Sequence, residues 1–263
     1  MLNRELKINF KAFCIWTLIT ILLYLVVFLI YPSIMTDSST ESLNEMMKVF
    51  PEDVLKSFNM DISSIDTVYG WLKSEGFVFL LLIIGCYSGI LGANILLKEE
   101  SDKTIEYLGT LPVKRTNIVI KKSITGIIYI TAITVIVGIF NYIGLKISGD
   151  FEEKQYILLS LTPLLSSYLV FFICLFLSTF TNKTKKMLGV SLGLVLISYV
   201  LNTLSTLSEK AEFLKYFSVF TLADIRNVIT NITINYKMVL ISFIGSILFL
   251  LLTIYRYNKK ELV

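Results

Sequence analysis

The sequence predicts an all-α polytopic membrane protein with six transmembrane helices. Apolar residues make up 55% of the 263 positions, and the mean hydropathy is +0.73, so the chain is more apolar than typical soluble domains. A helix needs about 20 apolar residues to cross the roughly 30 Å hydrocarbon core of a bilayer. Six windows of about that length contain no Asp, Glu, Lys or Arg: residues 12–36, 76–97, 123–145, 157–182, 187–208 and 238–255. Their length and lack of alternation favour helices over membrane β-strands.

The first window is expected to be a retained span rather than a signal peptide. Its apolar run exceeds the usual 7–15 residues, and the stretch YPSIMTDSS that follows offers no small-x-small cleavage site. Residues 1–11 mix apolar side chains with Arg4, Lys7 and Lys11. This pattern predicts an N-terminal interfacial helix at the inner membrane surface or, equally, a simple basic flank for the first span.

The distribution of basic residues predicts that both termini are cytosolic. With that orientation the cytosolic segments carry 15 Lys and Arg in 48 positions, whereas the outer loops carry 9 in 77. The outer loop 37–75 is acidic, with 8 acidic and 3 basic residues, and its apolar clusters predict a small folded or helical extracellular element.

Residues inside the spans predict how the helices pack. Gly85, Gly89 and Gly92 follow one side of the second span, and Gly189 and Gly193 do so on the fifth, a spacing that lets helix backbones approach closely. Pro163 is expected to kink the fourth span or to mark its outer end.

Several kinds of chemistry are absent from the sequence. The chain has no histidine, which excludes HExxH metalloproteases, Ser-His nucleophiles and His-ligated metal sites. It has no GxxxxGK[ST] phosphate-binding loop, and its charge-free spans argue against a proton relay. An intramembrane enzyme is therefore disfavoured, and any uphill transport needs energy from a partner.

The charged segment 98–122 between the second and third windows is the main candidate for docking a partner. Ser101 or Asp102 can cap a short helix that Pro112 ends. Apolar residues recur on it at i, i+3 and i+6, namely Ile105, Leu108 and Leu111, with Tyr107 flanking them. This helix could dock a protein or rest on lipid headgroups, in which case the basic residues Lys114, Arg115, Lys121 and Lys122 are only membrane anchors.

The same segment resembles a known family. The order Glu100, Thr104, Glu106, Leu108, Pro112-Val113, Arg115, Ile118 and then Lys121 or Lys122 is similar to the signature after the second helix of type-2 ATP-binding-cassette (ABC) exporter permeases. The six spans, cytosolic termini, N-terminal interfacial helix and partly re-entrant loop before the sixth span also resemble that family's plan. The resemblance implies one transmembrane permease domain over residues 1–263, although the loop 37–75 is longer and more acidic than the family's short connector.

The resemblance also implies partners and site residues. The segment 98–116 would contain a cytosolic coupling helix that sits in a groove of a separate ABC ATPase. Two ATPase copies and a second permease, identical or homologous, would complete the assembly in a bacterial cytoplasmic membrane. This chain would need no cofactor and no nucleic acid, since ATP and Mg would be bound by the ATPase.

The residues implied in coupling are Glu99, Glu100, Asp102, Thr104, Ile105, Glu106, Tyr107, Leu108, Leu111, Pro112 and Arg115. The glutamates would orient the helix, Ile105, Leu108 and Leu111 would fill the groove, and Arg115 would steady the turn into the third span.

The loop 209–237 has apolar residues at spacings of three and four, which predicts amphipathic helical pieces that dip back toward the membrane. We expect it to form an outer gate that includes Phe213, Phe217, Phe220 and Ile225.

The functional prediction is a permease that exports an amphipathic cargo, with a membrane-active peptide favoured over a lipid or drug. The alternative is a non-transporting immunity or sensor protein that binds a peptide or partner through the acidic loop 37–75.

Overall fold

The structure is a computed structural model that describes residues 1–34, 67–101, 113–207 and 209–260, and these residues form helices and connecting turns without any strand. The long helices are α1 (Leu2–Ile34), α5 (Phe77–Ser101), α7 (Arg115–Ser148), α8 (Glu153–Ser178), α9 (Thr184–Leu207) and α11 (Tyr236–Lys259). The short elements are α4 (Val68–Trp71), the π-helical turn η1 (Leu72–Gly76), the 3-10 helices η2 (Glu209–Phe217) and η3 (Val219–Ala223), and α10 (Ile225–Asn231).

Among the described residues, six helices are long and apolar enough to cross a membrane, which confirms the six predicted spans. The second is the continuous run Val68–Ser101, so it begins inside the predicted outer loop 37–75. The remainder of that loop, up to residue 66, lies outside the described residues. The first helix starts at Leu2, and residues 2–11 are its opening turns rather than an interfacial helix of their own.

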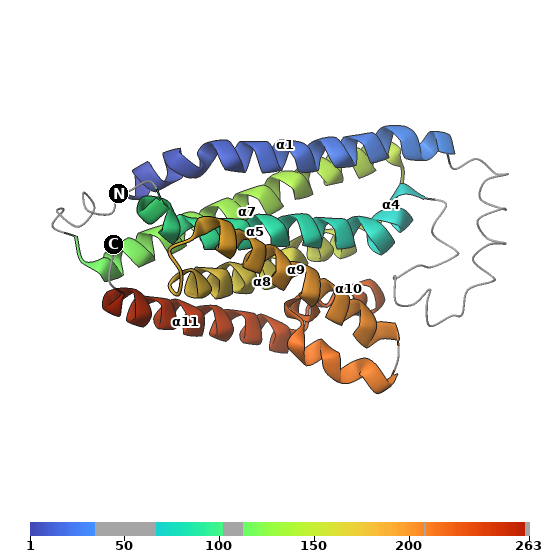
Figure 1. The fold of residues 1–263 in the computed structure, drawn as a ribbon. Coiled ribbons are helices and arrows are strands. Elements are labelled where there is room, and N and C mark those ends of the chain that lie inside the picture. The colour runs from blue at the N-terminus through green and yellow to red at the C-terminus, as the bar shows by residue number, and fades with distance from the viewer. Residues whose placement is uncertain (35–66, 102–112, 208, 261–263) are drawn as a thin grey trace.

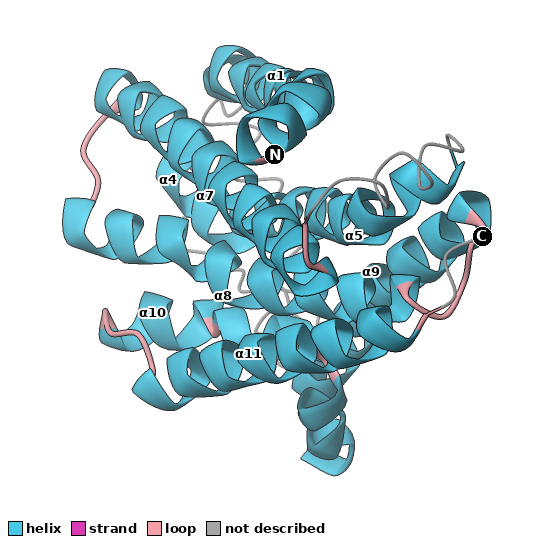
Figure 2. Cartoon of the chain, turned by 90° about the vertical axis from the view of Figure 1, so that its left-hand side faces the viewer, coloured by secondary structure: helices cyan, strands magenta, loops and turns pink. Residues whose placement is uncertain are grey.

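The helix α5 lies at the centre of the bundle, where it packs against α8, α9 and α7 (Figure 2). Most of its side chains are buried, whereas α1, α9 and α11 leave wide apolar faces exposed. In a membrane such faces meet lipid or another protein, because lipid tails accept apolar side chains at no cost.

The glycines of α5 make the predicted close approach. A Cβ added at Gly92 would lie 2.4 Å from the carbonyl oxygen of Phe171 on α8, and one added at Gly85 would lie 3.0 Å from Cζ of Phe220. Gly189 and Gly193 of α9 differ, since an added Cβ would have no described neighbour within 4 Å.

Pro163 lies inside α8 and does not end it. Proline cannot bond the carbonyl four residues earlier, which is that of Leu159. The hydroxyl of Thr162 donates to this carbonyl at 2.8 Å, so the freed acceptor is satisfied within the helix.

We predict that Gly92→Ala destabilises the fold, because the new methyl group meets the Phe171 carbonyl, which cannot move without shifting α8. Overpacking of this kind costs about 1–3 kcal/mol, which lowers Tm by several degrees in a chain of this size. Thermal unfolding of the purified protein in detergent measures the change in Tm. Gly138→Ala is the matched control and should leave Tm unchanged, because a Cβ added there would lie 3.6 Å from Cβ of Ser160, an ordinary contact; equal Tm values for the two variants would contradict the assigned packing.

Candidate functional site

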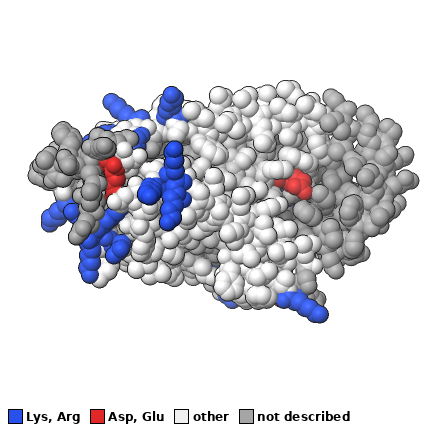
Figure 3. Space-filling view, viewed as in Figure 1, with Lys and Arg blue, Asp and Glu red and all other residues white. Residues whose placement is uncertain are grey.

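Both termini lie at one end of the bundle, here called the terminal end, and Lys and Arg side chains gather there (Figures 1 and 3). At this end α5 finishes at Ser101 and α7 begins at Arg115, so they flank the predicted coupling segment. Among the predicted coupling residues, Glu99, Glu100 and Arg115 are described. The other eight lie outside the described residues: Asp102, Thr104, Ile105, Glu106, Tyr107, Leu108, Leu111 and Pro112.

The first cluster at the terminal end surrounds Lys122 of α7, whose side chain is only 1% exposed. Its ammonium donates to both carboxylate oxygens of Glu99 on α5, at 2.7 and 2.8 Å. It also donates to Oε2 of Glu5 on α1 at 3.2 Å and to the carbonyl of Ile95. A buried charge is tolerated only when it is paired and hydrogen-bonded. This cluster, Glu5–Glu99–Lys122, therefore fixes α1, α5 and α7 to one another, and Lys122 is not a simple membrane anchor.

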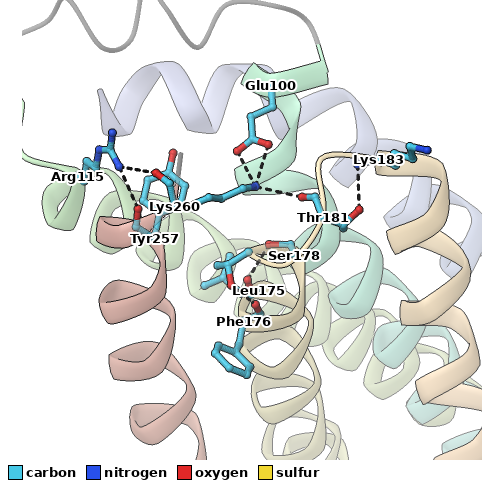
Figure 4. Close-up of polar contacts among 10 residues, drawn as sticks. Glu100, Arg115, Leu175, Phe176, Ser178, Thr181, Lys183, Tyr257 and Lys260 are labelled. Carbon is cyan, nitrogen blue, oxygen red and sulfur yellow. Dashed lines mark hydrogen bonds and ion pairs between the residues drawn. The ribbon is translucent and has the colours of Figure 1, made fainter. Parts of the chain in front are cut away.

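The second cluster forms around Glu100, the next residue of α5 (Figure 4). Its carboxylate accepts two hydrogen bonds of 2.9 Å from the ammonium of Lys260, which directly follows α11. The same ammonium donates to the carbonyl of Thr181 in the turn between α8 and α9, at 3.1 Å. Both charged side chains of this pair are largely buried. The Glu100–Lys260 pair thus joins α5 to α11 and to the α8–α9 turn.

Arg115 completes this cluster from the first turn of α7 (Figure 4). Its Nη1 donates to the carbonyls of Lys260 at 2.8 Å, Asn258 at 3.3 Å and Tyr257 at 3.4 Å. The Tyr257 and Asn258 carbonyls belong to the last turn of α11, where carbonyls lack partners within the helix, and the Lys260 carbonyl follows it. A cation at this position satisfies them and complements the helix dipole. The predicted role of Arg115 was to steady the turn into the third span; the structure adds a direct contact to the end of the sixth.

Two members of these clusters were not predicted from the sequence. Glu5 is the single acidic residue among residues 1–11, and Lys260 entered the prediction only as a positive charge near the C-terminus. Their partners are 117 and 160 positions away in the chain. The lone acidic residue in a basic segment was the available signal for Glu5, whereas Lys260 carried no signal that distinguished it from Lys259.

The predicted outer gate residues separate into two groups at the opposite end. Phe220 and Ile225 are buried, and the Phe220 ring packs against Gly85 of α5. Phe213 and Phe217 of η2 are exposed, Phe217 to 71%. The structure therefore does not bring the four side chains together.

Hydrogen bonds fix η3 and α10 in place at this end. The Ser218 hydroxyl donates to the Ser198 carbonyl of α9 at 2.6 Å. The Gln155 amide of α8 donates to the Ile229 carbonyl at 2.8 Å and accepts from the Tyr69 hydroxyl at 2.7 Å. Between η3 and α10, burial raises the pKa of the Asp224 carboxyl above its ordinary value.

The described residues contain no group of three or more His, Cys, Asp or Glu side chains placed to hold a metal ion. At the terminal end, two ion clusters connect α5 and α7, which flank the predicted coupling segment, to α1, to the end of α11 and to the α8–α9 turn.

Comparison with protein families matches residues 7–262 to the ABC-2 family transporter protein model. No curated protein matches the chain. The family match covers nearly every residue and agrees with the six spanning helices. The chain therefore belongs to the ABC-2 family, as a multi-pass membrane component of an ABC transporter.

Proposed function

We propose that this chain is the permease subunit of an ATP-driven exporter and that the two ion clusters transmit the motion of a cytosolic ATPase to all six spans. Membership of the ABC-2 family implies an ABC ATPase partner. In the proposal the terminal end faces the cytosol, the positive-inside orientation that its Lys and Arg residues favour. ATP and Mg²⁺ are bound by the ATPase, and two copies of the ATPase work with the permease.

The observation that carries the proposal is the position of the clusters on both sides of the coupling segment. Glu99 and Glu100 precede the segment on α5, and Arg115 and Lys122 follow it on α7. Removing one partner of a buried ion pair costs about 3–5 kcal/mol because the other charge is left uncompensated, so the two partners are expected to move together. A displacement of the segment would therefore carry α1 through Glu5 and α11 through Lys260 together with α5 and α7.

A second permease subunit would pack on the exposed face of α9. Gly189 and Gly193 leave that face open, with no described neighbour within 4 Å of an added Cβ. Small residues at this spacing are the common surface for close helix association in membranes. Two-fold pairing of this kind suits a transporter that works with two ATPase copies.

The cargo we favour is a membrane-active peptide, with a lipid or drug as the other amphipathic classes. The alternative, an immunity or sensor protein that binds through loop 37–75, depends largely on residues 35–66, which lie outside the described residues. The family match favours the permease over that alternative.

Leu108→Asp should abolish co-purification of the ATPase and cargo-dependent ATP hydrolysis, because a carboxylate cannot enter the apolar groove expected to receive this side chain. Thr110→Asp is the matched control, since Thr110 falls outside the stripe formed by Ile105, Leu108 and Leu111. Pull-down and ATPase assays with the partner ABC ATPase measure both effects. Normal assembly of the Leu108→Asp variant would falsify the docking assignment.

Lys260→Glu should uncouple the transporter while leaving the ATPase bound, because it places two carboxylates together at the joint between α5 and α11. We expect ATP hydrolysis to continue and export into proteoliposomes to fall severalfold. The double variant Glu100→Lys/Lys260→Glu should recover part of the export. Lys259→Glu makes the same charge change at a residue whose ammonium bonds the Tyr255 hydroxyl and lies over the same ring, on its own helix. Equal losses for Lys259→Glu and Lys260→Glu, or a double variant no better than the single one, would argue against transmission through this pair.

Substitutions of the two gate residues Phe217 and Phe220 should have different effects on export and on Tm. Phe217→Ala removes an exposed ring and should change export without lowering Tm or ATPase binding. Phe220→Ala empties the space beside Gly85 and should lower Tm, as buried Phe→Ala changes cost about 3–5 kcal/mol in soluble proteins. Export assays and thermal unfolding separate the two; unchanged export by Phe217→Ala would remove this side chain from the gate.

A further inference from the structure

A groove of about 400 Å³ lies between α7, α8 and α11, within their membrane-spanning parts. Among the described residues its lining comes from these three helices and consists of apolar and hydroxyl-bearing side chains. Along α11 it extends from Val239 to Leu250, about 16 Å at the 1.5 Å rise of a helix. Its volume falls in the range of about 300–1,000 Å³ typical of small-molecule sites. The groove takes no part in the coupling site or in the proposed gate.

Most hydroxyl groups of the groove already donate within the protein. The Thr131 hydroxyl donates to the Ile127 carbonyl at 2.7 Å, so the Tyr168 hydroxyl is the donor in its 2.6 Å bond with Thr131. The Ser242 hydroxyl donates to the Leu165 carbonyl at 2.5 Å. These bonds hold α11 against α8 and α8 against α7.

Ser246 is the exception. Its side chain lines the groove and the residue is 8% exposed, yet its hydroxyl has no hydrogen-bond partner among the described residues. Serine and threonine hydroxyls elsewhere on spanning helices commonly bond a carbonyl of their own helix, as Thr253 does with Phe249 at 2.7 Å. A buried hydroxyl without an acceptor is unfavourable in hydrocarbon. Ser246 therefore offers one free donor inside an otherwise apolar groove.

We propose that the groove binds one uncharged single-chain amphiphile of the long-chain alcohol class, whose chain lies along α8 and α11 and whose oxygen accepts a hydrogen bond from Ser246. The apolar walls would not compensate a charged headgroup. Tyr168 and Ser242 already donate their hydroxyl hydrogens, so Ser246 is the hydroxyl of the groove lining that keeps its hydrogen for an occupant. An ordinary lipid tail would fill the groove but leave the Ser246 hydroxyl unpaired.

The test uses two photoactivatable probes of equal length, a diazirine-bearing hexadecanol and a diazirine-bearing hexadecane, added to the purified chain in nanodiscs. Mass spectrometry of peptides locates the crosslinks. We expect saturable labelling of α7, α8 and α11 by the alcohol, reduced by an excess of plain hexadecanol. Labelling that is unsaturable and spread over all lipid-facing helices would overturn the proposal and identify surrounding lipid as the only occupant.

Two variants test the geometry. Ile247→Trp fills the groove and should abolish the saturable labelling, whereas Leu248→Trp, one residue away and outside the groove, should leave it intact. Ser246→Ala should weaken labelling by the alcohol by about three- to tenfold, the effect of one hydrogen bond, and leave labelling by the alkane unchanged. This last comparison stands even where the tryptophan variant does not fold. Equal labelling of Ser246→Ala and the unaltered chain by the alcohol would exclude the assigned hydrogen bond.

Discussion

The buried ammonium of Lys122 is the constraint on which the terminal end depends. An unpaired charge at 1% exposure is not sustainable, so the carboxylates of Glu99 and Glu5 must meet it, and they arrive from two other helices. This requirement sets the rotation of α5 and the position of the first turns of α1. Once α5 is rotated to face Glu99 toward Lys122, the next residue, Glu100, points to a different side, where Lys260 and Arg115 bring in α11. The consecutive residues Glu99 and Glu100 thus connect α5 to two different helices, α7 and α11.

The two ends of the bundle are held by different interactions. Ion pairs between buried side chains join the helices at the terminal end, whereas at the opposite end neutral hydrogen bonds and aromatic packing join them, together with the half-exposed Lys146–Glu153 ion pair between α7 and α8. Tyr24 donates to the Gly76 carbonyl at 2.6 Å, and Tyr69 bonds Gln155. Neutral hydrogen bonds contribute about 0.5–1.5 kcal/mol each, less than charge-assisted ones.

Local features were predictable from the sequence, and distant pairings were not. Hydropathy is a property of each window, so all six spans were found, and the small residues of α5 correctly indicated close packing. The identity of the packing partner, Phe171, depends on how α8 lies and carries no local signal. Phe217 and Phe220 are three residues apart and suggested one apolar stripe. The chain turns between η2 and η3 at Ser218, so one ring is exposed and the other is buried.

Two apolar surfaces of the chain, the face of α9 and the groove beside α11, differ in whether they present a hydroxyl that is free to donate a hydrogen bond. This difference decides which surface suits a protein partner and which suits a small ligand. On the exposed side of α9 the Thr203 hydroxyl donates to the Tyr199 carbonyl of its own helix at 3.1 Å. Among the described residues, that face therefore presents no free hydroxyl donor. The absence of a Cβ at Gly189 and Gly193 allows the backbone of another helix to approach closely. The groove beside α11 offers a free donor at Ser246 in a narrow apolar space. A helix from a second subunit would cover this donor with apolar side chains, whereas an amphiphile with one oxygen satisfies it. The two surfaces are thus suited to different occupants, although both lie in the membrane.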